Sequence, residues 1–205
     1  MTVEQERNRY HHGDLRATLL REATTLIRDS GVEALSLRRL SECAGVSRTA
    51  LYHHFRDKND LLCAIAQQGF VDLGALLRSD GGLPEGARQA GLRGFVRSYI
   101  QFAAAHAEQY DLMFGRTIWK AGVPTEALRE VAYATFRSYA ERIAEVLASL
   151  GETNPEKQLR LAQVSWATLH GLCRFLIDGI YVDQRDLDDI SQTAVTLLLD
   201  ALRRP

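Results

Sequence analysis

The chain has 205 residues, of which 46% are hydrophobic and 25% charged, and its formal net charge is −1. This composition excludes a disordered or collagen-like chain, and the length allows one or two domains whose core needs no disulfide or metal. No run approaches the roughly 18 apolar residues of a membrane span, and residues 1–9 are polar where a secretion signal is apolar. We therefore expect a cytoplasmic protein with no membrane partner.

The three cysteines, Cys43, Cys63 and Cys173, are isolated from one another and lack the spacing of a metal site. We expect free, mostly buried thiols, and neither a metal nor another cofactor. Residues 1–58 carry ten Lys and Arg against eight Asp and Glu, a net charge of +2, and the rest of the chain carries −3. So small an excess permits a nucleic-acid partner without establishing one.

Apolar residues recur at steps of three and four along most of the chain, which predicts an all-α fold. In the N-terminal part Ser36 and Ser47 are good caps for two short helices, and Gly45-Val46 turns the chain between them. A glycine-rich segment at 80–84 ends this part and, being short, is a loop rather than a domain linker. Four helices are expected here, at about 14–30, 37–44, 48–54 and from 57 to this loop.

The remaining sequence predicts further helices at about 87–107, 110–119, 126–150, 156–181 and 187–203. The last two carry apolar stripes wide enough to need cover from outside the chain's own core. We therefore predict a homodimer closed through 156–181 and 187–203 as a four-helix bundle. Burial of both stripes inside one chain is the alternative.

The segment Ser36–Phe55, SLRRLSECAGVSRTALYHHF, has the pattern of a helix-turn-helix. Its apolar residues face a shared core, and the small Ser41 lies where the two helices approach. The second helix presents a guanidinium, a hydroxyl, a phenol and an imidazole on its opposite face, and such groups read base edges or bind phosphates. Arg48 suits guanine, and Thr49 suits a thymine methyl or a phosphate. Phosphate contacts are expected on either side of this helix, from Arg38, Arg39 and Lys58.

Gly45-Val46-Ser47, followed by Ala50-Leu51-Tyr52-His53-His54-Phe55, Lys58 and Asp60-Leu61-Leu62, resembles the TetR family of bacterial transcriptional regulators. The resemblance covers roughly residues 10–71 and includes the opening Tyr10-His11-His12-Gly13-Asp14-Leu15-Arg16. It implies an N-terminal three-helix DNA-binding domain at 10–71 and a C-terminal helical ligand-binding and dimerisation domain at 72–205. It also implies a palindromic double-stranded DNA operator, contacted by Arg38, Arg48, Thr49, Tyr52, His53, His54 and Lys58.

Other interpretations of these residues stay open. His53 and His54 are adjacent and point about 100° apart on a helix, which argues against a shared metal. A half-buried His54 is as compatible with the pattern as a DNA contact. Arg7 and Arg9 suit either a minor-groove arm or a solvated terminus.

The C-terminal part is rich in aromatic residues between Phe95 and Phe175, most of which must be core. Members of the family hold a small effector there, and Trp166-x-x-x-His170-Gly171, with Tyr110–Gly115, resembles a WHG-type subgroup. The predicted pocket residues are Phe102, His106, Tyr110, Phe114, Trp119, Trp166 and His170. For His170 the alternative is a core histidine hydrogen-bonded to backbone.

The resulting hypothesis is a transcriptional repressor that binds its operator as a homodimer and leaves it when an effector binds. Activation or dual control is the alternative within the same family. The sequence contains no glycine-rich phosphate loop, GxSxG elbow or HExxH motif, so we expect no enzyme. A helical protein-interaction module is the remaining alternative, and it would show no salt-sensitive DNA binding.

Overall fold

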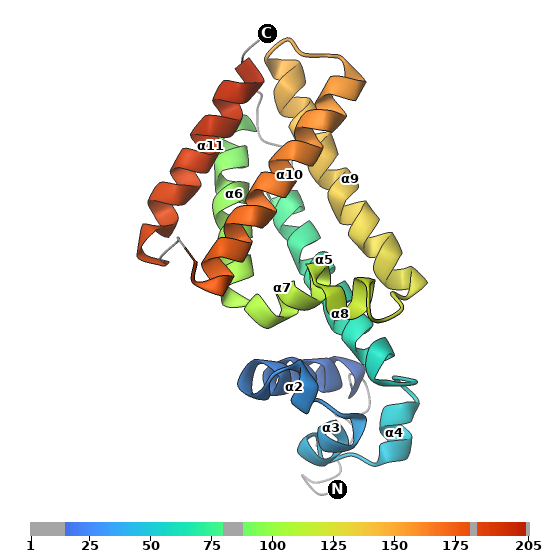
Figure 1. Cartoon of the computed structure of the whole chain (residues 1–205). Helices are drawn as coiled ribbons and strands as arrows, with labels where there is room; N and C mark the ends of the chain where they lie inside the picture. The colour runs from blue at the N-terminus through green and yellow to red at the C-terminus, as the bar shows by residue number, and fades with distance from the viewer. Residues whose placement is uncertain (1–14, 80–87, 181–183, 204–205) are drawn as a thin grey trace, which may run out of the picture. The chain divides into compact units, whose positions relative to one another are not determined.

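A computed structural model describes residues 15–79, 88–180 and 184–203, and all regular structure in these ranges is helical (Figure 1). The expected all-α fold is therefore confirmed. The α-helices are α2 Leu15–Ser30, α3 Leu37–Cys43, α4 Arg48–Tyr52, α5 Lys58–Ser79, α6 Arg88–Ala105, α7 Ala107–Phe114, α8 Arg116–Trp119, α9 Glu126–Ser149, α10 Pro155–Asp178 and α11 Leu187–Arg203. Short 3-10 turns lie at Val32–Ala34 and Gln184–Asp186.

Two helices differ from the sequence prediction, and the cysteines agree with it. The single helix expected at 110–119 is two helices, α7 and α8, because Gly115 has extended backbone (φ −83°, ψ 174°) where they meet. The helix expected to reach 181 ends at Asp178, since Gly179 adopts the left-handed conformation (φ +66°) that closes helices. Cys43 is exposed, whereas the other two cysteines are buried and all three are free, as expected. The glycine-rich segment at 80–84 and the helix start at Asp14 lie outside the described residues.

Contacts within the chain define two compact units. The first contains residues 1–69 and 108–129, and the second contains residues 70–107 and 130–205. Helices α5 and α9 each continue from one unit into the other, after Gly69 and Arg129 respectively. The division into domains 10–71 and 72–205 stays a prediction, and residues 108–129 group with the first unit.

The first unit is built around the apolar faces of its short helices. Helix α2 buries Leu19, Ala23 and Ile27, and α3 and α4 each add one fully buried leucine. Helix α5 contributes a nearly continuous buried run from Leu61 to Ala66, which explains its high apolar content. The α7 residue Gln109 is also buried, and its side-chain amide donates to the backbone oxygen of Ile65 at 3.0 Å. That bond satisfies a polar group that burial would otherwise leave costly.

The second unit packs α6 against both α10 and α11. Its core is aromatic: the ring of Trp166 lies 5.5 Å from that of Tyr99, 5.7 Å from Phe136 and 4.8 Å from Tyr139, measured between centroids. The Tyr139 hydroxyl donates to Ser165 Oγ at 2.8 Å. Edge-to-face ring pairs of this kind stabilise a core beyond their buried area. Trp166 is therefore surrounded by three aromatic rings.

Candidate nucleic-acid interface

The turn between α3 and α4 is set by two serine caps and one glycine. Ser36 Oγ accepts from Arg39 N and Ser47 Oγ accepts from Ala50 N, each at 3.1 Å. Gly45 has φ +65°, a backbone conformation that residues other than glycine rarely adopt, and it lies in the turn between the two helices. The turn predicted from the sequence therefore has the expected caps and glycine.

The two helices share a compact core that fixes how α4 is presented. Leu40, Leu51 and Phe55 are at most 1% exposed, and the small Ser41 is buried beside them. Ser41 Oγ donates to the backbone oxygen of Arg38 at 2.7 Å, so its hydroxyl is satisfied within its own helix. Because one face of α4 is buried in this way, the opposite face is left for a partner.

The predicted contact residues of α4 lie on that opposite face. Arg48, Thr49 and His53 are exposed, and the Tyr52 side chain is 55% exposed although it is a large aromatic residue. His54 is half-buried, and its ring centroid lies 6.4 Å from that of Phe55. A short helix with this surface can enter a major groove and offer both hydrogen-bond donors and an aromatic ring to DNA.

The flanking cations differ in how they are held. Arg38 is exposed, and its Nε donates to Glu42 at 2.9 Å in a pair that solvent screens on both sides. Arg39 instead reaches back to the backbone oxygen of Ala34 at 3.4 Å and to Ser30 Oγ at 3.3 Å. Both side chains are exposed, so neither is buried out of reach of a phosphate.

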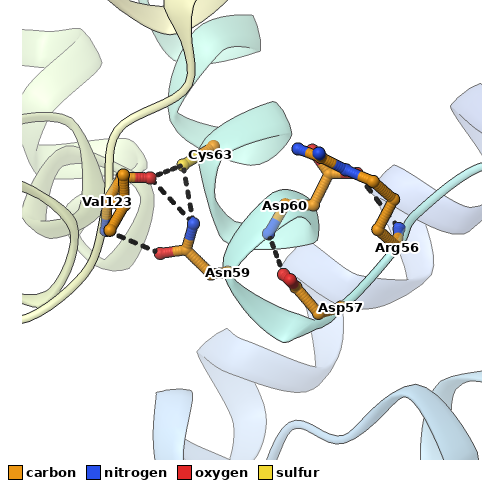
Figure 2. Close-up of polar contacts among 6 residues, drawn as sticks. All are labelled: Arg56, Asp57, Asn59, Asp60, Cys63 and Val123. Atoms are coloured by element: carbon orange, nitrogen blue, oxygen red, sulfur yellow. Dashed lines mark hydrogen bonds and ion pairs between the residues drawn. The ribbon is translucent and has the colours of Figure 1, made fainter.

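Sequence reasoning missed how the start of α5 is fixed. Asp57 Oδ1 accepts from Asp60 N at 2.7 Å, and Asp60 Oδ2 accepts from Arg56 N at 3.1 Å, as Figure 2 shows. Reciprocal capping of this type holds a helix N-terminus in place. Lys58, half-buried, is the first residue of this capped helix. The spacing Asp57-x-x-Asp60 was the available signal.

The predicted pocket residues fall into both units. Tyr110, Phe114 and Trp119 belong to the first unit, where the Tyr110 and Phe114 rings lie 4.7 Å apart and Trp119 Nε1 donates to the Met113 backbone oxygen at 2.7 Å. The rings of Phe102 and His106 lie 5.0 Å apart in the second unit. Trp166 and His170 also belong to that unit, on α10.

His170 is partly buried in the second unit. Burial lowers its pKa below the ordinary 6.5, and the positive charge of Arg174 lowers that pKa further. The neutral imidazole is therefore favoured at neutral pH, which suits either a core hydrogen bond or a ligand contact.

A separate apolar groove runs between α10 and α11, with Val96 of α6 at its base. Its volume is about 510 Å³. None of the predicted pocket residues lines it. The α10 and α11 side chains on its walls include Leu161, Val164, Thr168, Leu172, Ile190 and Leu197.

The described residues contain neither a metal-binding cluster nor an exposed membrane-spanning helix. Within ranges 15–79, 88–180 and 184–203, no group of three or more His, Cys, Asp or Glu side chains is placed to hold a metal ion. One helix, Lys58–Arg78, is long and apolar enough to cross a membrane, but 61% of this stretch is buried inside the protein. That burial is typical of a core helix.

Comparison with known families identifies the class. Residues 19–65 match the bacterial regulatory proteins of the tetR family, and residues 92–202, more than half of the chain, match the tetracyclin repressor-like C-terminal domain. The chain belongs to the TetR family. Members of the TetR family are DNA-binding transcriptional regulators rather than enzymes, so the protein is a regulator that binds operator DNA through its helix-turn-helix.

Similar TetR-family proteins include regulators of both signs. The HTH-type transcriptional repressor AcnR of Corynebacterium glutamicum is 26% identical over 164 residues, which are 80% of this chain and 78% of AcnR. The HTH-type transcriptional activator FasR of Mycolicibacterium smegmatis is 30% identical over 107 residues, covering 52% of this chain and 48% of FasR. A solved structure of a protein of unknown function from Rhodococcus sp. RHA1 is 32% identical, with a TM-score of 0.81 and coverage of 95% and 98%.

Proposed function

We propose that this TetR-family protein is a cytoplasmic repressor that binds an inverted-repeat operator as a homodimer and is released by a small-molecule effector. The observation that carries the proposal is the exposed face of α4 with its C-cap, where the side chains of Arg48, Thr49, Tyr52 and His53 are left open to solvent. A purely structural helix-turn-helix has no need of this surface. Base-edge recognition in the major groove requires such a surface.

Within that proposal each side chain has a defined role. Arg48, in the first turn of α4, makes a paired contact to guanine, and Thr49 contacts a thymine methyl or a phosphate. The exposed Tyr52 and His53 contact phosphate or base, and the half-buried His54 contacts the backbone at the edge of the interface. Arg38 and Lys58 bind phosphates on either side and set the register of α4.

The proposed homodimer is supported by the apolar surface of α10 and α11. Val164 and Leu197, on opposite walls of the groove, are 64% and 66% exposed. Gly171, on α10, lies inside a helix where glycine costs about 0.5–1 kcal/mol relative to alanine, and a Cβ placed there would meet no described atom within 4 Å. Nothing within the described chain accounts for that glycine, whereas close approach of a helix from a second copy does.

The proposed effector site lies in the second unit. Phe102, His106, Trp166 and His170 supply aromatic surface and two imidazole rings, which suit an uncharged or weakly polar organic ligand. The WHG-type resemblance of Trp166 and His170 supports placing the site on the side of α10 that carries these two residues. Tyr110, Phe114 and Trp119 belong to the first unit and are not part of this proposed site.

Repression is favoured over activation by the broader match to AcnR, a named repressor that aligns with 80% of this chain. The match to FasR, a named activator, keeps activation as the second candidate. The sign of regulation is tested by placing the operator and its native promoter before a reporter gene. Reporter output that rises when the regulator gene is deleted supports repression, and output that falls supports activation.

DNA binding is tested by selecting duplexes from a random pool with the purified full-length protein. We expect an inverted repeat whose half-sites are about one helical turn apart, because two copies related by a two-fold axis read successive major grooves. Binding to the selected duplex should weaken steeply with salt. A single unrepeated half-site would overturn the dimeric part of the proposal.

A further inference from the structure

Asn59, in the first turn of α5, makes a two-point contact with a segment 64 residues later in the sequence. Its Nδ2 donates to the Val123 backbone oxygen at 2.8 Å, and its Oδ1 accepts from Val123 N at 3.2 Å. Figure 2 shows the amide plane turned to meet both backbone groups. Both residues belong to the first unit, and Val123 lies in the loop between α8 and α9.

The loop is shaped to receive this amide. At Gly122 a Cβ would lie 2.5 Å from Asn59 Oδ1 and 2.8 Å from the Thr117 backbone oxygen, so only glycine fits without a shift. Cys63, one turn later in α5, places Sγ 3.7 Å from the Val123 oxygen. The Val123 side chain is itself 71% exposed, so the contact depends on its backbone.

Asn59 is not needed to cap α5. Asp57 and Asp60 already satisfy that end through the bonds Asp57 Oδ1 to Asp60 N and Asp60 Oδ2 to Arg56 N. The Asn59 amide bonds Val123 instead, and its Nδ2 also lies 3.8 Å from Cys63 Sγ one turn later in α5. Its neighbour Lys58 is the proposed phosphate contact, and both residues lie in the first turn of α5.

The loop that Asn59 holds leads directly into α9. Helix α9 starts at Glu126, and from Glu130 onward it belongs to the second unit. Helix α5 likewise enters the second unit after Gly69. The Asn59–Val123 contact therefore joins the first-unit end of α5 to the chain that opens α9.

We propose that Asn59 is a positioning residue for operator binding: it fastens loop 120–125 to the first turn of α5 and thereby holds Lys58 where it contacts phosphate. The proposal rests on the proposed DNA contact of Lys58. The loop before α9 is then part of the structure that presents Lys58 to DNA. Displacement of this loop loosens the α5 end that carries Lys58.

The test breaks the contact from both sides. Asn59→Leu removes both hydrogen bonds without adding charge, and Gly122→Ala displaces the amide from the loop side. Val123→Ala is the matched control, because it changes an exposed side chain and keeps both backbone groups. Each full-length variant is titrated with the duplex that wild type selects from a random pool, at several salt concentrations, and circular dichroism checks that it is folded.

We expect Asn59→Leu and Gly122→Ala each to weaken binding about tenfold, because Lys58 is no longer held against its phosphate. The double variant should bind about as weakly as Gly122→Ala alone, because that alanine, which also meets the Thr117 backbone oxygen, already displaces the Asn59 amide. The slope of log affinity against log salt concentration should become shallower by about one unit in each case, which corresponds to one lost phosphate contact. Val123→Ala should match wild type. A folded Asn59→Leu protein with wild-type affinity and salt slope would overturn the proposal.

Amide hydrogen exchange of the free protein separates this inference from the DNA-binding proposal. In Asn59→Leu we expect faster exchange both in loop 120–125 and in the first turn of α5. Faster exchange confined to the loop would overturn the coupling, whatever the protein does with DNA. An unchanged salt slope in Lys58→Ala would instead overturn the phosphate contact, while the exchange result would still decide whether Asn59 positions α5.

Discussion

The proposed dimer surface on α10 and α11 allows a prediction whose magnitude follows from the exposed fractions of two side chains. Val164 and Leu197 are 64% and 66% exposed on the walls of the α10–α11 groove. Full burial of such a side chain contributes about 1.5–3 kcal/mol, so covering the part still exposed contributes about 1–2 kcal/mol. A two-fold interface presents each side chain twice, which gives about 4–8 kcal/mol for the four. Replacing both by lysine should therefore raise the dimer dissociation constant at least about a thousandfold.

Sedimentation equilibrium at micromolar concentration measures this change directly. Wild type should sediment as a dimer, and the Val164→Lys/Leu197→Lys variant should sediment as a monomer that binds the selected operator far more weakly. Tyr133→Lys is the matched control, because Tyr133 is 68% exposed on α9 and does not line the groove. If the double variant stayed dimeric, or if Tyr133→Lys dissociated the dimer equally, the assignment of this surface would be refuted.

Three further predictions concern stability. Ser47→Ala should lower the free energy of unfolding by about 1 kcal/mol in urea titration, because α4 loses its cap, and Ser47→Asp should restore it; equal midpoints would contradict the cap's importance. Tyr139→Phe should lower the free energy of unfolding by about 1 kcal/mol, because the hydrogen bond to Ser165 is lost. Burial raises the pKa of Tyr139 to about 12, so its hydroxyl stays a donor at neutral pH. An unchanged melting temperature would count against that bond. Because burial and Arg174 lower the pKa of His170, the unfolded state takes up a proton first as pH falls through 6.5. Wild-type stability should then fall below that pH, and His170→Gln should remove this part of the pH dependence; the same slope in both proteins would contradict it.

The helix-turn-helix could be predicted almost completely because its determinants are local. Capping serines and the left-handed Gly45 act within a few residues, and the three-and-four spacing identifies which face is buried. The exposed face of α4 followed from the same periodicity. For the same reason the sequence predicts one helix at 110–119 where there are two: apolar periodicity continues through Gly115, and only its extended backbone shows the break between α7 and α8.

The tertiary contacts could not be predicted from the sequence. The pairing of Asn59 with Val123 joins residues 64 positions apart, and nothing local distinguishes this asparagine from a solvated one. The packing of three rings around Trp166 was equally hidden, since periodicity shows that a residue is buried but not what surrounds it. The grouping of residues 108–129 with the first unit depends on such contacts too.

The central claim, that the exposed face of α4 reads operator sequence, is tested most directly by repeating the random-pool selection with Arg48→Ala. Wild type and the variant should recover the same inverted repeat, except that one base pair in each half-site becomes degenerate in the variant. At that position the variant should lose about 1–3 kcal/mol of discrimination. An identical selected sequence with identical affinity would contradict the account.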